Sequence, residues 1–537
     1  MRVDRRAVVA GLGVVGAVAA AGLGWRATRP APPATTLAGA DMERGHRLRV
    51  GGFPEPSETE EAGVVIAGGG VAGLAAGWAL AEAGFEDFQL FELEDAVGGN
   101  ARSGRNDVSA FPLGAHYLPV ANREARALRH LLTGLGIITG EADGAPVYDP
   151  LQLCADLQER LLWRGSWQEG LIPRTGLEPR DEAHLAAFDA AMRAFSARIG
   201  ADGKPAFATP LAYSSRDPDL LALDGTNFAA WLDEQGWDSP VLRAHVRYGM
   251  RDDYGCEPAD VSAWAGVHYY AGRRGWAAND AADNVLTWPE GNDRLARGMA
   301  DQFRGQIRSG RIVHRVTRDG DRILVDSFDV SRQTTIRTRA RAAILAMPRF
   351  VAAHVAPELP PATAFGYAPW LVANVTVDRL PTGRGAPLAW DNVSSTSNSL
   401  GYVVATHQGP AAIPGASVLT WYLPLSDMSP SEGRRLLVER SADEWRAVVT
   451  DDLLATNPDL EGAIRAVDLW RWGHAMIRPV PGLIWGGAPD AARAEPPLFL
   501  AHSDLSGLSL FEEAHYRGVL AAEGAMRHLG HGFESLL

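Results

Sequence analysis

The chain has 537 residues, of which 46% are hydrophobic and 22% charged, a composition typical of a globular protein with two or three domains. Its formal net charge of -14 disfavours nucleic-acid binding. The two cysteines, Cys154 and Cys256, are too few for a disulfide framework, although they allow one bridge.

Residues 1–40 have the features of a targeting segment. Arg5 and Arg6 precede an apolar run of Ala, Gly and Val at residues 7–24. The paired arginines resemble a twin-arginine export signal, a route that suits a protein which takes up its cofactor before export. We therefore expect the export machinery as a partner and a periplasmic or other extracytoplasmic location. The signal is either cleaved near the small residues 37–40 or retained as a membrane tether.

A glycine-rich turn after the first buried strand organises the rest of the chain. The β-branched run at residues 64–67 predicts a strand, and the residues after the turn predict a helix. In a dinucleotide-binding unit, Gly68 permits the tight turn, Gly70 lets the backbone approach a pyrophosphate, and Gly73 lets the helix pack on the strand. The phosphates then lie at the positive end of the helix dipole. The residues expected at this part of the cofactor are Gly68, Gly70, Val71, Ala72 and Gly73.

An acidic residue ends the next strand. Residues 88–92 form this predicted strand, and Glu92 stands where it can accept hydrogen bonds from a ribose. Strand, turn, helix, strand and acid in this order predict a dinucleotide site far more strongly than a lone GxGxxG motif. A second GxGxxG at residues 11–16 has no strand before it and no such acid after it, so we assign it no ligand.

Two further glycines, Gly98 and Gly99, follow Glu92 closely, and Asn100 and Arg102 come next. This stretch resembles the second glycine pair of the flavin amine oxidase superfamily, which includes monoamine and polyamine oxidases, protoporphyrinogen oxidases and phytoene desaturases. The resemblance implies that FAD is the dinucleotide and that these residues run under its pyrophosphate. An arginine often follows the pair in that superfamily, whereas here Asn100 takes its place and Arg102 comes two residues later. An ordinary surface turn is the alternative interpretation.

Three later segments also resemble parts of the superfamily's cofactor site. They are a glycine-containing segment at residues 112–117, a hairpin predicted at residues 311–325, and a closing strand and helix at residues 497–522. The resemblance implies these positions: Gly114, Ala115 and His116 at the flavin ring, Val313 at the adenine, Asp504 at the ribityl or phosphate part, and Gly518 where the last helix approaches the flavin.

The predicted fold class is α/β, with a Rossmann-like FAD-binding domain of the glutathione-reductase type and an interleaved α+β substrate domain. Amphipathic spacing predicts a helix at residues 181–199, which we place in the substrate domain. The predicted divisions are a signal and linker at residues 1–40, a FAD-binding domain at residues 60–135, 285–350 and 480–535, and a substrate domain at residues 136–284 and 351–479.

The chemistry implied by the resemblance is that of a flavin enzyme. No second strand-plus-GxGxxG unit occurs in the middle of the chain, so a small organic substrate rather than NAD(P)H should supply the electrons. We expect hydride transfer from a substrate C–H group to flavin N5 and reoxidation by oxygen or another acceptor. Neither cysteine lies in the closing motif, so FAD should be bound without a covalent bond. We assign no metal ligands.

Departures from the superfamily's pattern leave the substrate open. The strand lysine that holds a water against N5 in many members is absent at the matching residues 373–374, and residues 475–476 and 510–511 stand where monoamine oxidases have two caging aromatics. The leading hypothesis is oxidation of an amine. The alternatives are C–C desaturation of a lipophilic substrate and a flavin-binding accessory protein whose active-site residues have drifted. The candidates for the catalytic pocket are His116, His474 and Trp472, although a lone histidine is more often structural.

Overall fold

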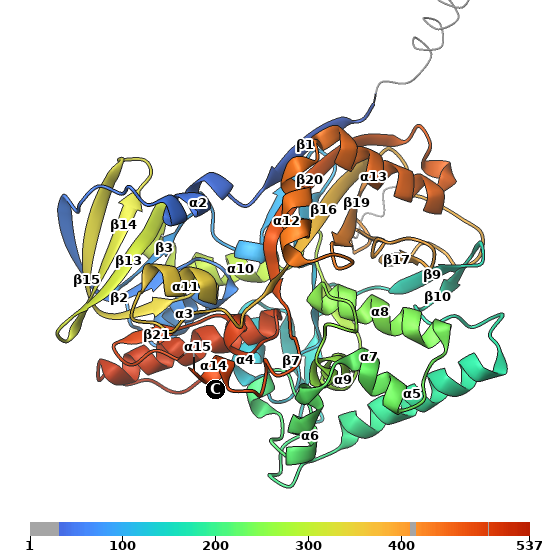
Figure 1. The fold of residues 1–537 in the computed structure, drawn as a ribbon, viewed down its shortest axis with the longest axis horizontal. Coiled ribbons are helices and arrows are strands. Elements are labelled where there is room, and N and C mark those ends of the chain that lie inside the picture. The colour runs from blue at the N-terminus through green and yellow to red at the C-terminus, as the bar shows by residue number, and fades with distance from the viewer. Residues whose placement is uncertain (1–31, 409–414, 492) are drawn as a thin grey trace, which may run out of the picture.

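The computed structural model of the protein describes residues 32–408, 415–491 and 493–537, and two large β-sheets dominate it (Figure 1). The seven-stranded sheet lies on the left of Figure 1 and the eight-stranded sheet on the upper right. Most of the predicted signal falls outside the described residues. Within the described ranges, no helix is long and apolar enough to cross a membrane, and no group of three or more His, Cys, Asp or Glu residues is arranged to hold a metal ion.

The seven-stranded sheet is built around the strand that carries the glycine turn. Its strands are β2 (Glu58–Ala67), β3 (Phe88–Glu92), β12 (Ile307–Ser309), β13 (Arg311–Asp319), β14 (Arg322–Asp329), β15 (Thr334–Leu345) and β21 (Leu498–Leu500). β2 runs parallel to β3 and β15, and β21 runs parallel to β15. β13, β14 and β15 form an antiparallel meander. Three segments far apart in the sequence therefore meet in one sheet.

Helices cover both faces of this sheet: α3 (Val71–Glu82), α4 (Arg126–Gly134), α10 (Asp293–Ala300), α11 (Arg349–Val355) and α15 (Phe511–His528). Successive residues of β2 point to opposite sides. Val64 and Ile66 pack with residues of α3, α10 and α15, whereas Val65 and Ala67 pack with residues of β13 and α11. Burial on both faces explains why residues 64–67 of this strand form a continuous apolar run.

The eight-stranded sheet has the order β1-β20-β16-β19-β18-β17-β9-β10. These strands are β1 (Ala34–Gly39), β9 (Glu159–Trp163), β10 (Ser166–Glu169), β16 (Tyr367–Val377), β17 (Asp391–Ser394), β18 (Tyr402–Val404), β19 (Ser417–Pro424) and β20 (Ile464–Ile477). α12 (Pro430–Glu439) and α13 (Ala442–Thr456) contribute to the core on one face, where Leu371 is buried. On the other face, Trp370 and Val372 of β16 pack with Tyr422 and Trp472.

A helical region packs beside the eight-stranded sheet, in the lower right of Figure 1. Its helices are α5 (Pro179–Ala197), α6 (Pro218–Ala222), α7 (Phe228–Glu234), α8 (Pro240–Tyr254) and α9 (Ala263–Ala271). The remaining small elements are β4 (Ser103–Arg105), β5 (Ala110–Pro112), β6 (Tyr117–Pro119), β7 (Ile138–Ala142), β8 (Ala145–Tyr148), β11 (Val285–Thr287) and α14 (Ala488–Ala491).

The structure differs from the sequence prediction most clearly near the N-terminus. Residues 34–39, predicted as part of the signal and linker, form β1, and a helix follows, α2 (Met42–Val50). β1 is an edge strand of mostly small residues that is held by backbone pairing with β20, so its sequence needs no apolar pattern. β2 begins at Glu58, two residues before the predicted start of the FAD-binding domain. Its acidic residues lie beside arginines of the β14–β15 hairpin, such as Arg339, which pairs with Glu61.

Candidate active site

The turn between β2 and α3 opens a helix N-terminus toward a cavity. Gly68 has a φ of +110°, in the left-handed region that favours glycine. A Cβ atom at Gly73 would lie 1.9 Å from the Gly68 carbonyl oxygen, so this position has no room for a side chain. Gly70 is the N-cap of α3, and no side chain in the described structure caps it. The first-turn N–H groups therefore offer a site for an anion.

Glu92 stands beside this turn at the end of β3. Its Oε2 accepts a hydrogen bond from the Gly69 N–H (2.7 Å), and its Oε1 accepts one from the Glu94 N–H (2.8 Å). Burial raises the pKa of Glu92, and the two hydrogen bonds oppose that rise. The Gly98 N–H donates to the Gly69 carbonyl (2.7 Å), so the second glycine pair lies against the first turn.

A cavity of about 940 Å³ runs along these elements and lies between the two large sheets. Its volume is at the upper end of the range for ligand pockets. A Cβ atom at Gly70 would meet nothing closer than the Gly99 Cα, at 4.0 Å, so protein packing does not require a glycine there. The predicted cofactor residues that line this cavity are Gly68, Gly70, Val71, Ala72, Glu92, Gly99, Asn100, Ala115, Val313 and Asp504.

Some predicted cofactor residues shape the walls without lining the cavity: Gly73, Gly98, Arg102 and Gly518. A Cβ atom at Gly518 would lie 2.2 Å from the Ala72 carbonyl oxygen, so α15 touches the first turn of α3. Arg102 donates to Glu94 Oε2 (2.6 Å), and its guanidinium carbon lies 5.7 Å from the ring centre of Trp472. Arg102 thus holds the loop after Glu94 instead of reaching into the cavity.

Asp504 lines the cavity with a fully buried carboxylate in a short 3₁₀ helix, η6 (Ser503–Leu505). Its Oδ2 accepts hydrogen bonds from the Arg349 N–H (2.8 Å) and the Tyr367 hydroxyl (2.5 Å). Its Oδ1 lies 3.0 Å from Nδ1 of His502. Although burial opposes ionisation, His502 and these hydrogen bonds lower the pKa of Asp504. The ionised carboxylate therefore fixes this side of the cavity.

A smaller pocket of about 160 Å³ adjoins the cavity. Aromatic rings from separate elements form much of its wall: Tyr117 of β6, Tyr269 of α9, Trp370 of β16 and Tyr422 of β19. Gly114 and His116 also line it. The residues that line both spaces, and so mark their boundary, are Asn100, Ala115, Trp472, Ala475, Ser509, Leu510 and Phe511.

The smaller pocket carries more acidic than basic side chains. Asp252 and Asp253 of α8 and Glu512 of α15 line it, and Arg273 is the one lysine or arginine among its described lining residues. Arg273 Nη2 donates to Asp253 Oδ1 (2.6 Å), so that acid is paired. Burial, together with the charge of Asp253, raises the pKa of Asp252, and burial raises the pKa of Glu512 to about 7. Asn292 adds a buried Oδ1 acceptor that has no hydrogen-bond partner in the described part of the chain.

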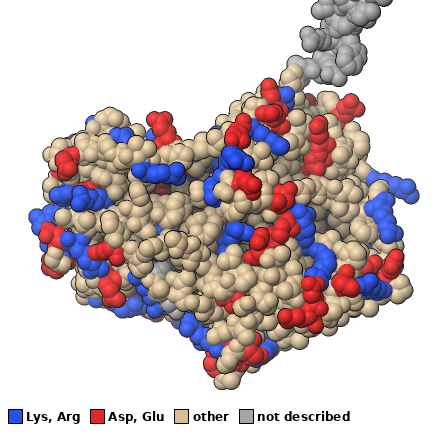
Figure 2. Space-filling view, in the orientation of Figure 1, with Lys and Arg blue, Asp and Glu red and all other residues tan. Residues whose placement is uncertain are grey.

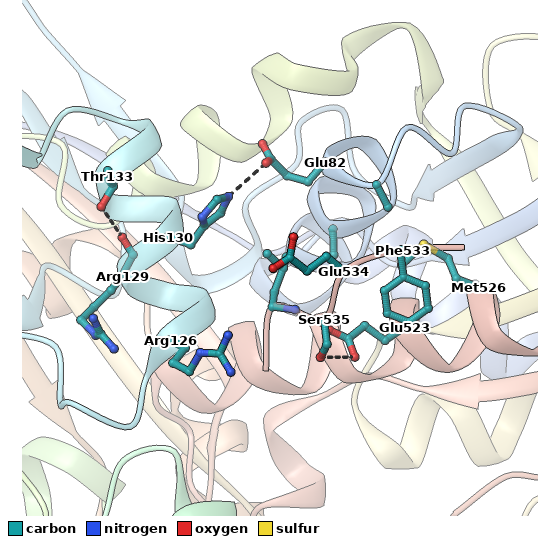
Figure 3. A pocket seen from close by; sticks show the side chains of 13 residues that line it. Glu82, Arg126, Arg129, His130, Thr133, Glu523, Met526, Phe533, Glu534 and Ser535 are labelled. Atoms are coloured by element: carbon teal, nitrogen blue, oxygen red, sulfur yellow. Dashed lines mark hydrogen bonds and ion pairs between the residues drawn. The ribbon is translucent and has the colours of Figure 1, made fainter. Parts of the chain in front are cut away.

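A third cavity, of about 500 Å³, lies between α3, α4 and α15 and is lined differently (Figure 3). Three acids, Glu82, Glu523 and Glu534, and two arginines, Arg126 and Arg129, line it, and two of the acids have polar or basic partners. His130 Nε2 lies 3.1 Å from Glu82 Oε2, and Glu523 accepts hydrogen bonds from Ser535 and Arg527. Acids outnumber lysine and arginine three to two here and three to one in the smaller pocket, so the imbalance is larger in the pocket beside the cofactor cavity.

The comparison with known proteins identifies the family. Residues 71–523 match the family model described as flavin containing amine oxidoreductase. The chain belongs to this family. It is therefore an FAD-dependent oxidoreductase, and the resemblance predicted from its glycine motifs is confirmed.

Several solved structures are similar in fold along most of the chain. Putrescine oxidase bound to putrescine is 18% identical, covers 87% of this chain and 100% of its own, and has a TM-score of 0.62. Cyclohexylamine oxidase from Brevibacterium oxydans IH-35A is 18% identical, covers 87% and 99%, and has a TM-score of 0.62. A fatty acid isomerase from P. acnes is 15% identical, covers 86% and 98%, and has a TM-score of 0.60. These likenesses confirm the predicted α/β fold. No curated protein sequence matches the chain.

The larger cavity fits FAD, the cofactor of the amine oxidoreductase family. The open N-terminus of α3 suits the pyrophosphate, Glu92 suits a ribose, and the space beside Gly70 admits a close approach to the backbone. Cys154 and Cys256 are buried and free, and neither is among the described residues that line the two spaces. This arrangement agrees with non-covalent binding.

The structure separates the three candidate catalytic residues of this FAD-dependent oxidoreductase. His116 lines the smaller pocket, its ring centre lies 4.6 Å from that of Tyr422, and burial lowers its pKa to about 3. Trp472 lines both spaces, and its Nε1 donates to the Leu113 carbonyl (2.6 Å). His474 lines only the larger cavity, and burial lowers its pKa to about 4. His116 and Trp472 therefore meet at the smaller pocket, and His474 stays on the cofactor side.

Sequence reasoning did not single out Asp252, Glu512 and Asn292 as pocket residues. Asp252 lies in a stretch similar to the family's substrate-domain helices, and Glu512 lies in its closing motif, but neither position has a pattern that marks it. The one available signal was the adjacent pair of acids at residues 252–253, because it stands among tyrosines and not on an evidently polar helix face.

Proposed function

We propose that this protein oxidises a small amine by removing a hydride from the C–H group next to the nitrogen, and that oxygen or another acceptor takes up the electrons. FAD, when bound, supplies the hydride-accepting flavin. The observation that carries the proposal is the excess of acidic side chains in the pocket that shares a wall with the cofactor cavity.

A protonated amine complements the charge of this pocket. Asp253 is paired with Arg273, but Asp252 and Glu512 have no further lysine or arginine among the described lining residues. Ionising both acids in a small buried space is costly, which is why their pKa values rise. An ammonium group would reduce that cost, whereas a carboxylate would increase it. The volume of about 160 Å³ supports a small substrate.

The same acids can accept a proton from the substrate. An ammonium group must lose a proton before the nitrogen lone pair can assist departure of a hydride from the adjacent carbon. A carboxyl group with a pKa of about 7, such as Glu512, is suited to that transfer near neutral pH. His116 has a pKa of about 3, so it is neutral there and a weak base, and its contact with Tyr422 gives it a packing role in the wall.

One observation favours a second candidate function, desaturation of an apolar substrate. The rings of Tyr117, Tyr269, Trp370 and Tyr422 form walls that also suit a C–C substrate without charge. For such a substrate the unpaired acids would be protonated spectators. The acidic excess is the reason that we favour the amine.

Anaerobic titration of the purified holoprotein tests the proposal. Small primary amines are expected to bleach the flavin absorbance. Bleaching by apolar alkenes alone would instead support desaturation, and a fully loaded protein reduced by neither class would support an accessory role. Admitting air after reduction and assaying peroxide determines whether oxygen is the acceptor.

We propose, separately, that the protein leaves the cytoplasm by the twin-arginine route. Arg5 and Arg6 before an apolar run support this proposal. Replacing both by lysine is expected to retain the FAD-loaded protein in the cytoplasmic fraction of a host that has this machinery. An unchanged distribution between fractions would contradict the proposal.

A further inference from the structure

The N-terminal strap (residues 34–53) crosses from one large sheet to the other. β1 forms the edge of the eight-stranded sheet, and α2 lies toward the seven-stranded sheet, at the top of Figure 1. The strap precedes residue 71, where the match to the family begins. Its role therefore has to be read from its contacts in this chain.

Backbone pairing fixes the first end of the strap. β1 runs parallel to β20 over its whole length. The Thr36 hydroxyl donates to Asp468 Oδ1 (2.7 Å), and Leu37 packs against the core of the eight-stranded sheet. At Gly39 the two strands are so close that an added Cβ atom would lie 2.7 Å from the Arg471 carbonyl oxygen.

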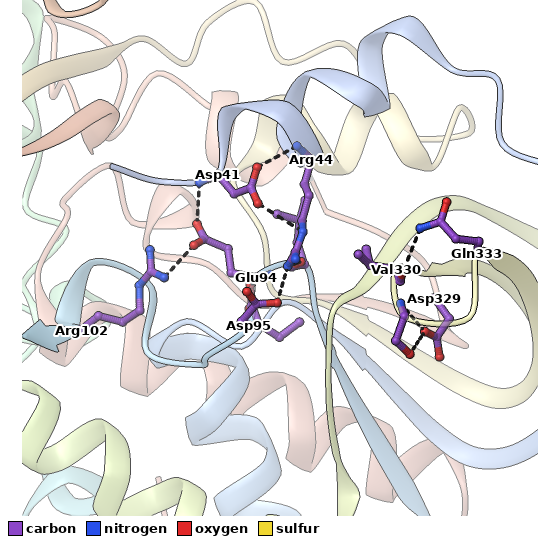
Figure 4. A network of polar contacts seen from close by, with 11 residues as sticks. Asp41, Arg44, Glu94, Asp95, Arg102, Asp329, Val330 and Gln333 are labelled. Carbon is purple, nitrogen blue, oxygen red and sulfur yellow. Dashed lines mark hydrogen bonds and ion pairs between the residues drawn. The ribbon is translucent and has the colours of Figure 1, made fainter. Parts of the chain in front are cut away.

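Polar contacts fix the strap to the loop that follows Glu92 (Figure 4). Arg44 Nη1 donates to a backbone carbonyl of this loop (3.0 Å) and to Asp95 Oδ1 (2.7 Å). The Asp41 N–H donates to Glu94 Oε1 (3.2 Å). Glu92 is the acid suited to a ribose, so these contacts hold the loop on which part of the cofactor site depends.

The last part of the strap is held by packing. The Arg47 guanidinium carbon lies 4.0 Å from the ring centre of Phe328, and Leu48 packs against the core on the α11 side of the seven-stranded sheet. The ring of Phe53 stacks on that of His314, with centres 4.2 Å apart. The strap is thus anchored on both sheets and held at three places.

Between its anchors the strap lines the larger cavity. Arg49 and His46 of the strap line this cavity together with Arg434 and Arg435 of α12. Figure 2 shows basic side chains over α2 and α12, on either side of the hollow between the two sheets. This positive charge complements the two phosphates of a dinucleotide. The strap residues that line the cavity include Ala40, Met42, Gly45, His46, Leu48 and Arg49.

We propose that the N-terminal strap is an additional part of the FAD site, which closes over the bound dinucleotide and slows its release. Coupling between two binding events is reciprocal, so bound FAD holds the strap in place as strongly as the strap holds FAD. The proposal concerns the cofactor and does not depend on which substrate the enzyme oxidises.

The rate of FAD release from the holoprotein tests the proposal. Arg44→Met keeps the length of the side chain but removes its hydrogen bonds to the loop after Glu92. We expect this variant to release FAD about tenfold faster than wild type, because it loses one to two hydrogen bonds of a charged group. The fluorescence of the freed cofactor measures the release. Arg304→Met, which removes an exposed ion pair with Asp301 away from the cavities, is the matched control and should match wild type. Equal release from all three proteins would overturn the proposal.

Limited proteolysis of the wild-type chain gives an independent test that needs no variant. Trypsin cleaves after arginine, and the strap presents Arg44, Arg47 and Arg49. We expect cleavage at these residues to be at least about tenfold slower in the FAD-loaded protein than in the apoprotein, because local opening must precede cleavage. Equal cleavage rates in the two forms, with cleavage elsewhere also unchanged, would overturn the proposal.

Discussion

The cofactor cavity and the smaller pocket share a wall, but they are built in different ways. The cavity depends on backbone groups and on glycines that lie within one turn of the chain, from Gly68 to Gly73. The pocket depends on side chains that lie far apart in the sequence, such as Asp252, Asn292 and Glu512. A local sequence pattern can therefore reveal the cofactor site, whereas the acids of the substrate pocket are brought together only by folding.

The largest expected effects distinguish two glycines of the same turn. Gly70→Val places its side chain in the cavity without a close protein contact, so we expect a folded protein that binds FAD at least about a hundredfold more weakly, or ~3 kcal/mol. Gly73→Val would clash with the Gly68 carbonyl oxygen, so we expect it not to fold. Flavin absorbance and circular dichroism of the purified variants measure both outcomes. Wild-type FAD content in Gly70→Val would contradict the placement of the cofactor.

The next largest effect falls on the substrate pocket. Asp252→Asn removes a carboxylate proposed to face the substrate ammonium, so kcat/KM for a small amine should fall about a hundredfold, roughly 3 kcal/mol, while FAD content stays unchanged. The control Asp321→Asn changes an exposed acid in the loop between β13 and β14 and should have no effect. If Asp252→Asn kept wild-type kcat/KM for amines, the pocket would not be selecting for charge.

A smaller effect is expected from pH. Burial raises the pKa of Glu512 from 4.5 to about 7, so its carboxylate forms as pH rises through about 7, and kcat/KM for a protonated amine should rise over the same range. Glu512→Gln should flatten that part of the profile. A profile that Glu512→Gln leaves unchanged would exclude Glu512 as the ionising group.

The same pKa shift predicts the direction of a stability change. Between pH 4.5 and about 7 the folded state holds the Glu512 proton more tightly than the unfolded state, so this group's contribution to the free energy of unfolding falls as pH rises. Thermal unfolding of the apoprotein at several pH values checks this, with Glu512→Gln expected to lose less stability than wild type toward neutral pH. A larger loss of stability in the variant than in wild type would contradict the predicted direction.

The smallest effect concerns the wall of the smaller pocket. Tyr422→Phe removes the hydrogen bond from the tyrosine hydroxyl to the Gly114 carbonyl (3.0 Å) but keeps the ring against His116. We expect a loss of about 1 kcal/mol in the free energy of unfolding, measured by denaturant titration, and retention of FAD. Loss of FAD in this variant would show that the hydroxyl also supports the cofactor cavity.

The elements that the sequence predicted well are those whose pattern is set by their neighbours in the chain. The strand at residues 88–92 has the predicted bounds, and the hairpin around the Asp-Gly turn forms as β13 and β14. Gly73 of α3 and Gly518 of α15 were predicted as glycines of the cofactor domain, and both lie directly against backbone, where a side chain has no room. Each of these requirements is local, or it comes from one helix packing on another.

The elements that the sequence did not predict are set by partners far away in the chain. The sequence of β1 has no apolar alternation, because backbone hydrogen bonds to β20 hold this strand at the edge of the sheet. α2 is rich in arginine and has no fully buried residue, so its pattern could not be distinguished from that of a linker. Asp252 and Glu512 carry no mark of burial in the sequence, because the aromatic walls around them come from other segments.

The position of β1 sets a limit on how the chain can be processed. A peptidase that cut at residues 37–40 would remove most of an edge strand and would separate it from the helix that adjoins the cavity. Maturation that preserves the described fold therefore has to take place upstream of Ala34. Under the twin-arginine export proposed above, FAD loading and closure of this segment would both come before transport.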